Sequence, residues 1–276
     1  MDVLDSILSA ILPLVDAQMD AIVEAMGELS RIEQRADFGA FEASAAYLQQ
    51  RFQSGGIAAE VLRSIGAEVI PLFDEVDGDF PNHHPDPSEP ENLQDLIESV
   101  RLTEADIGVA FDGDADRLGV VTPSGDIVGP DRVMMLYVRE ILGRKPGETI
   151  IYDVKCTGHL DKVIRDAGGQ PEMYKTGHSL MKNRMKEVGA PLAGEMSGHM
   201  FFADRYFGFD DAIYASCRLL ELLAATGKTI PELLSDVPKT YTTPEIRVPC
   251  ADDKKFDVVK AVTTYFRERQ KIIDID

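Results

Sequence analysis

Three aspartates, Asp112, Asp114 and Asp116, alternate with small residues, and Arg117 follows them at once. Because acids this close repel one another, each resists ionisation unless a cation lies between them. Oxygen ligands on a short loop suit Mg²⁺ or Ca²⁺ rather than zinc. Mg²⁺ usually keeps positions that a substrate phosphate can fill, and an adjacent arginine suits a phosphate or sugar oxygen. The segment therefore predicts a divalent-cation site that handles phosphate.

Two other structures are compatible with these aspartates. An Asp-Gly dipeptide is common in turns, so an acidic turn without metal also fits. An EF-hand loop opens with Asp-x-Asp-x-Asp, but Arg117 stands where that loop requires glycine and Pro123 where it requires glutamate. The flanking residues 107–111 and 118–121 are largely apolar, which predicts strands rather than EF-hand helices.

Two further segments combine glycine with histidine, at 175–179 and 194–199. The first lies between an expected strand and an expected helix, where backbone N–H groups can bind an anion. The second alternates polar residues with glycines, which suits a loop whose backbone approaches a ligand. One histidine alone is more often structural than catalytic, but two such turns at neighbouring strand ends indicate a binding site.

A long polar loop is expected over 74–90, and it contains adjacent histidines, His83 and His84, beside Asp86. The pair lacks helical i,i+4 spacing and no thiolate is near, so a loop fixed by prolines is favoured over a metal site. Loops of this length are often lids or domain edges.

The chain has 276 residues, 44% of them apolar, and a formal net charge of −20. This charge argues against nonspecific binding to nucleic acid or anionic membranes, although a locally basic site can still take an anionic substrate. Neither a signal peptide nor an apolar run of about 18 residues is found, which predicts a cytoplasmic protein. The three cysteines, Cys156, Cys217 and Cys250, are far apart and are expected to be small buried residues.

The elements that must position these residues follow an α/β pattern. Helices are expected over 57–65, 91–103, 132–142, 160–167, 180–188, 212–225, 230–234 and 256–266, and strands over 67–73, 107–111, 118–121, 127–128, 149–154, 171–174 and 245–248. Asp131 is expected to cap the helix that follows it, and Arg132 faces either a phosphate or solvent.

The predicted fold is α/β, with two consecutive domains that each contain a mixed sheet flanked by helices. The domains are expected over 54–126 and 127–240, and residues 241–276 begin a further one. Residues 1–53 are predicted to be acidic and helical. A packed pair of helices is favoured over a coiled coil, because apolar heptads are not sustained.

Together these motifs resemble the α-D-phosphohexomutase family, in particular its bacterial phosphomannomutase/phosphoglucomutase members. The likeness extends over roughly residues 54–276, and several motifs in family order are more specific than any one alone. The matching segments are 82–87, 111–117, 130–132, 153–156, 175–179, 194–199 and 205–211.

The resemblance implies interconversion of hexose 1-phosphate and 6-phosphate through a phosphoserine and a bisphosphorylated sugar. It implies Mg²⁺ held by Asp112, Asp114 and Asp116, and catalytic roles for Arg117, Arg132 and Lys155. It further implies a sugar site formed by His178, Ser179, Glu195, Ser197 and His199, where the glutamate accepts hydroxyl hydrogen bonds. Mannose and glucose depend on the same loop, so both fit as substrates.

The sequence also departs from the family. Its phosphoserine loop, Thr/Ser-x-Ser-His-Asn-Pro, has no match here, 38–42 stands where an apolar first strand is expected, and Ala115 replaces a commoner glycine. The chain is therefore expected to correspond to the second and third of four family domains, and to bind metal without turning over alone. A non-catalytic binding remnant and an acidic interaction protein that assembles through residues 1–53 are the alternatives.

Overall fold

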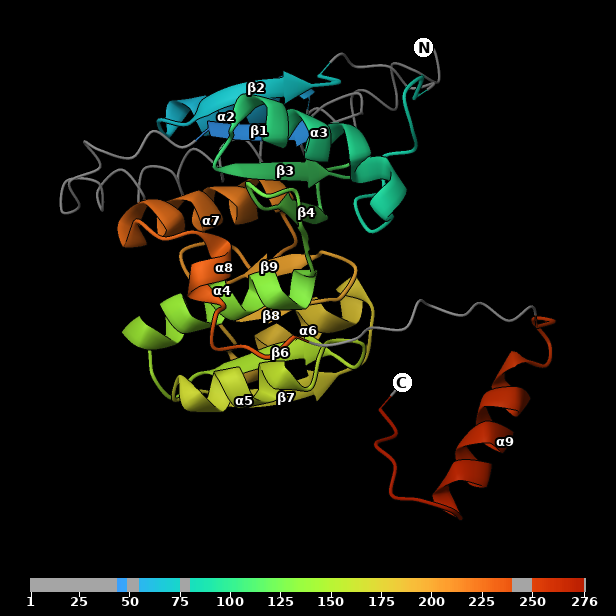
Figure 1. Ribbon diagram of the computed structural model, residues 1–276. Helices are drawn as coiled ribbons and strands as arrows, with labels where there is room; N and C mark the ends of the chain where they lie inside the picture. Colours follow the sequence, from blue (N-terminus) through green and yellow to red (C-terminus); the bar gives the residue numbers. More distant parts are fainter. Residues whose placement is uncertain (1–43, 49–54, 75–79, 240–249, 276) are drawn as a thin grey trace, which may run out of the picture.

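The computed structural model describes residues 44–48, 55–74, 80–239 and 250–275, which form two sheets with helices between and around them (Figure 1). This confirms the predicted α/β class with two sheets flanked by helices. The helical prediction for 1–43 and 49–53 and the strand prediction for 245–248 lie outside the described residues.

The first sheet has the strand order β2-β1-β3-β4-β5. Its strands are β1 (Ser44–Leu48), β2 (Glu68–Leu72), β3 (Ile107–Phe111), β4 (Leu118–Val121) and β5 (Ile127–Val128). β1 pairs in parallel with β2 and β3, whereas β3, β4 and β5 form an antiparallel meander. The helical prediction was therefore wrong at 44–48. Its small and apolar residues fit either state, and pairing with a strand on each side decides between them.

The second sheet has the order β7-β6-β8-β9. It consists of β6 (Thr149–Asp153), β7 (Gln170–Tyr174), β8 (Leu192–Gly194) and β9 (Met200–Phe202). The first three strands are parallel, and β9 is antiparallel to β8. The carboxyl ends of β6, β7 and β8 therefore lie at one edge, which is where open α/β sheets bind ligands.

Most of the observed helices are one to four residues longer than the predicted ones. They are α2 (Gly55–Ser64), the 3₁₀ turn η1 (Pro90–Leu93), α3 (Gln94–Thr103), α4 (Pro130–Arg144), α5 (His159–Asp166), α6 (His178–Val188), α7 (Ala212–Thr226), α8 (Ile230–Leu233) and α9 (Lys255–Arg267). None of the described helices is long and apolar enough to cross a bilayer.

Three local predictions need correction. The α4 N-cap position is Gly129, and Asp131 instead accepts the backbone N–H of Thr157 at 2.9 Å, which joins α4 to the turn after β6. α6 begins at His178, so that histidine lies in the first helical turn rather than in the loop. Cys250 is exposed, whereas the other two cysteines are buried as expected.

α7 lies between the two sheets, although its sequence follows the second one (Figure 1). It packs against β3 and β4 of the first sheet and against β9 of the second, and it also contacts α4. Its first N–H, from Ala212, donates to the carbonyl of Ala115 at 2.9 Å. One hydrophobic cluster consequently runs from Leu62 through Val120 to Leu219 without interruption.

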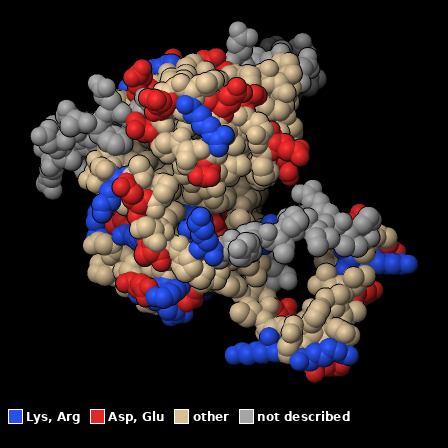
Figure 2. All heavy atoms as spheres, viewed as in Figure 1, with Lys and Arg blue, Asp and Glu red and all other residues tan. Residues whose placement is uncertain are grey.

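Charged residues on the body surface are mixed in sign rather than segregated, on the face that Figure 2 shows. α9 stands apart from this body in Figure 1, and none of its residues is buried. Its apolar side chains face solvent: Phe256 is 77% exposed and Tyr265 is 53% exposed.

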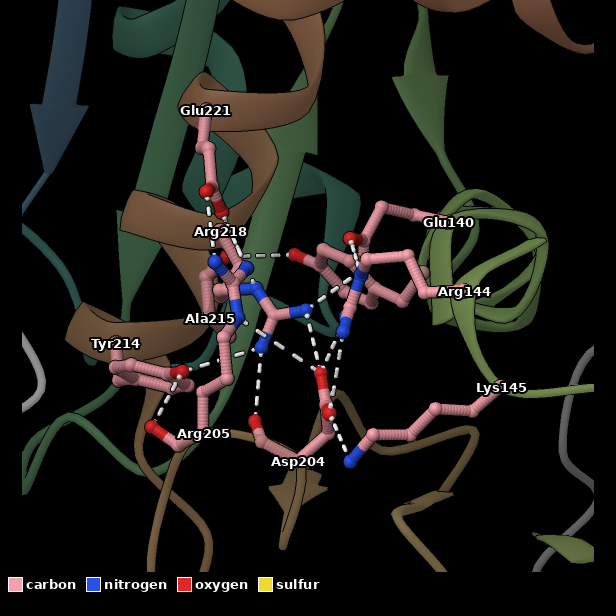
Figure 3. A network of polar contacts seen from close by, with 10 residues as sticks. Glu140, Arg144, Lys145, Asp204, Arg205, Tyr214, Ala215, Arg218 and Glu221 are labelled. Atoms are coloured by element: carbon pink, nitrogen blue, oxygen red, sulfur yellow. Dashed lines mark hydrogen bonds and ion pairs between the residues drawn. The ribbon is translucent and has the colours of Figure 1, made fainter. Parts of the chain in front are cut away.

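A buried charge network fixes α4 and α7 to the segment between β9 and α7 (Figure 3). The carboxylate of Asp204 is fully buried and contacts Arg144 at 2.5 Å, Lys145 at 2.8 Å and Arg218 at 3.2 Å. Arg218, whose side chain is 1% exposed, also pairs with Glu140 at 2.7 Å. Although burial alone would raise it, hydrogen bonds from Arg144 and Lys145 hold the pKa of Asp204 well below its usual range.

We expect Asp204→Asn to lower the free energy of unfolding by about 3–5 kcal/mol, because it removes the fully buried carboxylate that the buried guanidinium of Arg218 shares with Arg144 and Lys145. Asp236→Asn is the matched control. Asp236 pairs with Arg139 at 2.7 Å but is 69% exposed, so its loss should cost at most about 1 kcal/mol. Urea denaturation of the three proteins measures both values. Equal losses would contradict the structural role of the network.

The stability difference between wild type and Asp204→Asn should depend on pH. A carboxyl whose pKa is lowered on folding stabilises the protein above its unfolded pKa of about 3.9, and this contribution is lost as the pH falls towards the folded pKa. The gap between wild type and Asp204→Asn should therefore be full at neutral pH and shrink in acid. A gap that stays constant as the pH is lowered would oppose this assignment.

Candidate functional site

The acidic turn between β3 and β4 is folded by its own first carboxylate. Asp112 is 2% exposed, and its Oδ1 accepts the backbone N–H groups of Asp116 at 3.0 Å and Arg117 at 3.1 Å. Ala115 takes the left-handed conformation with φ 58°, which costs an alanine about 1–2 kcal/mol relative to glycine. The hydrogen bond between its carbonyl and Ala212 helps to hold this conformation.

The guanidinium of Arg117 is held from two directions. Its Nε donates to Asp112 Oδ2 at 2.6 Å, and one terminal nitrogen donates to Asp86 Oδ1 at 3.1 Å. Asp86 belongs to the proline-fixed loop, where it also accepts from the backbone and hydroxyl of Ser88. Sequence reasoning missed the role of Asp86, although its place in a segment that matches the family was a signal.

The carboxylates of the acidic turn are crowded, and this crowding raises the pKa of one of them. Oxygens of Asp112, Asp114 and Asp116 lie within 4.8 Å of one another, and Asp114 is exposed. Burial, together with the charge of Asp116, raises the pKa of Asp112 to about 6. A divalent cation would remove that repulsion, so the residues present fit a hard metal ion.

The turn between β8 and β9 carries a carboxylate and a histidine. Glu195 is 2% exposed; its Oε1 accepts the backbone N–H of Gly177 at 2.5 Å, and its Oε2 lies 3.1 Å from His199 Nδ1. Ser197 Oγ is 2.7 Å from the same imidazole nitrogen. The other ring nitrogen, Nε2, is 3.3 Å from Asp116 Oδ1. Burial lowers the pKa of His199, but hydrogen bonds to Asp116 and Glu195 outweigh it and raise that pKa to about 9.

The two turns are docked onto each other through their backbones. Arg117 and His199 form an isolated antiparallel bridge, and the N–H of Leu118 donates to the carbonyl of Gly198 at 3.1 Å. Gly198 has φ +103°, and a Cβ added there would lie 3.1 Å from the Leu118 oxygen. The acidic turn of one sheet thus adjoins the glutamate–histidine turn of the other.

α6 adds a second imidazole to this junction. The ring of His178 stacks on that of His199, with centroids 6.2 Å apart and planes at 19°. Its Nδ1 lies 3.9 Å from Oδ2 of Asp210, whose other oxygen accepts from Lys182 Nζ at 2.9 Å. Ser179, the next residue of α6, is exposed. Sequence reasoning did not single out Asp210 or Lys182 as site residues, although Asp210 lies in a segment that matches the family.

The two remaining predicted catalytic residues lie in neighbouring turns. Arg132, at the start of α4, donates to the carbonyls of Pro238 at 3.2 Å and Val237 at 3.4 Å. Lys155 is exposed in the turn after β6, where its backbone N–H donates to Asp153 Oδ1 at 3.1 Å. Their catalytic roles stay predictions.

An acidic turn of one sheet docked on a polar, glycine-containing turn of the other is an arrangement that can place a hard cation beside an anionic ligand. Two family models match the chain. Phosphoglucomutase/phosphomannomutase, alpha/beta/alpha domain II, matches residues 53–125, and domain III matches residues 129–241. The chain belongs to the α-D-phosphohexomutase family, as the sequence motifs predicted.

Individual relatives agree with the family models. A phosphomannomutase/phosphoglucomutase of Pseudomonas putida is 53% identical over 209 residues, covering 76% of this chain and 45% of the relative. A phosphoglucomutase of Neisseria gonorrhoeae is 54% identical over 194 residues, covering 70% and 42%. A solved phosphoglucomutase/phosphomannomutase family protein of Burkholderia thailandensis superposes with a TM-score of 0.71 at 48% identity, covering 80% of this chain and 48% of that one. The chain thus spans about half the length of these relatives.

We expect Gly198→Ala to separate the two docked turns. The added methyl meets the Leu118 carbonyl in a left-handed backbone, so the loss of stability should exceed that of a strained but unobstructed glycine. Gly66, with φ +95° and nothing within 4 Å of an added Cβ, is the matched control. Chemical denaturation should show a loss of about 1–2 kcal/mol for Gly66→Ala and about 1–3 kcal/mol more for Gly198→Ala.

The docking argument would be contradicted if both alanine variants lost the same stability. A heteronuclear NMR spectrum of Gly198→Ala gives a second check. Amide shifts should change at Leu118 and around Asp116, across the contact, and not only beside the substituted residue.

Proposed function

We propose that this chain supplies the cation- and sugar-binding part of a phosphohexomutase that interconverts hexose 1-phosphate and hexose 6-phosphate, with both mannose and glucose as substrates. The observation that carries the proposal is the docking of the acidic turn on the turn of Glu195 and His199. It brings three clustered aspartates next to a carboxylate that can accept hydrogen bonds from two neighbouring hydroxyl groups. The names of the relatives support the same activity.

In this proposal Asp112, Asp114 and Asp116 hold Mg²⁺. The ion would supply charge neutralisation at a phosphate, and phosphoryl transfer depends mainly on such positioning and electrostatic stabilisation. Arg117, clamped between Asp86 and Asp112, keeps a fixed positive charge beside the turn. It would orient a phosphate or sugar oxygen without first having to be ordered.

The sugar is proposed to lie against Glu195, Ser197 and His199, with His178 and Ser179 on the α6 side. Hydrogen bonds from His199 and Gly177 lower the pKa of Glu195 against the effect of burial, so the glutamate is an acceptor at neutral pH. The raised pKa of His199 makes this residue a hydrogen-bond donor at the same pH. Arg132 and Lys155 are proposed as further phosphate contacts.

We also propose the domain division 54–126, 127–240 and 241–276, with β1 and β5 completing the sheet of the first domain from outside these bounds. A cytoplasmic location is proposed as well. The family's phosphoserine loop has no match in the printed sequence, which favours a second candidate function, metal and sugar-phosphate binding without turnover. Binding and turnover must therefore be measured separately.

Magnesium should stabilise the folded chain by mass action, by about 2.7 kcal/mol at a concentration of 100 times its dissociation constant. Asp114→Asn removes an exposed ligand of the acidic turn and should abolish most of this gain. Asp126→Asn, which changes an exposed acid of the next turn, should leave it intact. Thermal unfolding across a Mg²⁺ titration provides the measurement. A gain of the same size in Asp114→Asn would refute the assignment of the cation to this turn.

Turnover is expected to be absent when the chain is assayed alone with hexose 1-phosphate, Mg²⁺ and hexose bisphosphate. Binding of the sugar phosphate, followed by calorimetry, should remain measurable and weaken in Glu195→Gln, because a bond to a charged group contributes about 1.5–3 kcal/mol. Robust turnover would refute the need for a separate phosphoserine segment. Failure to bind any hexose phosphate would refute the proposed function itself.

A further inference from the structure

A second group of ligand atoms lies beside the acidic turn. Donor atoms of Asp116, His199 and Asp210 are within 4.8 Å of one another. They come from three separate segments: the turn after β3, the residue before β9 and the residues before α7. The antiparallel bridges Arg117–His199 and Phe201–Asp210 hold the three segments together.

The carboxylate of Asp210 is incompletely satisfied in this group. Its side chain is 8% exposed, and Oδ1 accepts from Lys182 at 2.9 Å. Oδ2 is buried and has no hydrogen-bond partner among the described residues. His178 Nδ1 is 3.9 Å from this oxygen, which is beyond hydrogen-bond distance. An unsatisfied buried oxygen is costly, so a cation bound there would remove a penalty that the folded chain otherwise carries.

The donor set selects the kind of cation. One imidazole nitrogen and two carboxylate oxygens, with His178 Nδ1 as a fourth donor nearby, suit a borderline transition-metal ion such as Zn²⁺ or Co²⁺ rather than Mg²⁺. Asp116 Oδ1 and His199 Nε2 are 3.3 Å apart. Two ligands at bond lengths of about 2.0–2.1 Å around a tetrahedral ion are separated by about 3.4 Å, which this pair already matches.

We propose that Asp116, His199 and Asp210 form a second cation site for a transition-metal ion such as Zn²⁺. It shares Asp116 with the acidic turn and is otherwise distinct from it. An ion bound there takes both Asp116 and His199 out of their other contacts. Zinc-like ions therefore compete with the hard cation and the sugar at this junction, a consequence that rests on the proposed function, whereas the site itself does not. The site follows from the ligand geometry and does not depend on mutase activity.

Co²⁺ alone, added to the metal-free chain, is the probe, because its visible absorption reports coordination and its paramagnetism shifts the resonances of bound imidazoles. Wild type should show a tight site with hyperfine-shifted signals from His199. Asp210→Asn should weaken Co²⁺ binding by more than about tenfold, since changes beyond the ligands themselves already cost 10–100-fold. Asp114→Asn is the matched control, because Asp114 belongs to the acidic turn but not to the proposed second site. This variant should retain the Co²⁺ affinity of wild type.

Each other result overturns the proposal. Unchanged affinity in Asp210→Asn would show that Asp210 is no ligand, and equal loss in Asp114→Asn would place the ion in the acidic turn. Shifted signals that survive in His199→Gln would assign the ion to other histidines, such as the adjacent His83 and His84. This last experiment decides the question even if Asp210→Asn does not fold.

Discussion

The contact between Asp116 and His199 is the interaction on which the candidate site depends. It joins the acidic turn of one sheet to the glutamate–histidine turn of the other, 83 positions later in the numbering of the chain. The backbone bridge between Arg117 and His199 fixes the same junction. Without this junction, a cation bound at the aspartates and a sugar bound at Glu195 would have no defined distance between them. Phosphoryl transfer depends on such positioning.

Acidic side chains outnumber basic ones at this junction, and each basic group lies within contact distance of a particular carboxylate. Six carboxylates lie at this junction with one arginine, one lysine and one histidine whose pKa is raised. The carboxylates are those of Asp86, Asp112, Asp114, Asp116, Glu195 and Asp210. The excess of negative charge makes the region a receptor for cations in the first place. In the proposed function, a divalent cation at the aspartates would offset this excess and so lower the repulsion of an anionic substrate. The same logic separates this site from the network around Asp204, where arginines and a lysine already neutralise the acids.

Much of the fold could be predicted from the sequence, because apolar runs such as 107–111 and glycine stops such as Gly227 act locally. The strand at Ser44–Leu48 could not, since its state is decided by partners far along the chain. The cluster of Asp112, Asp114 and Asp116 was predictable because the three residues lie within one turn. Asp86 and Asp210 were not, because their partners lie far along the chain. Only the folded chain brings Asp86 to Arg117 and Asp210 to Lys182.

The position of α7 has a consequence for how the protein can be divided. This helix follows the second sheet in sequence yet covers the first, and its opening N–H closes the acidic turn. A cut near residue 128 would therefore strip the first sheet of its cover and leave the second with an exposed apolar helix. Because one hydrophobic cluster spans both sheets, the two halves are expected to unfold together, and the shared helix argues against a hinge between them.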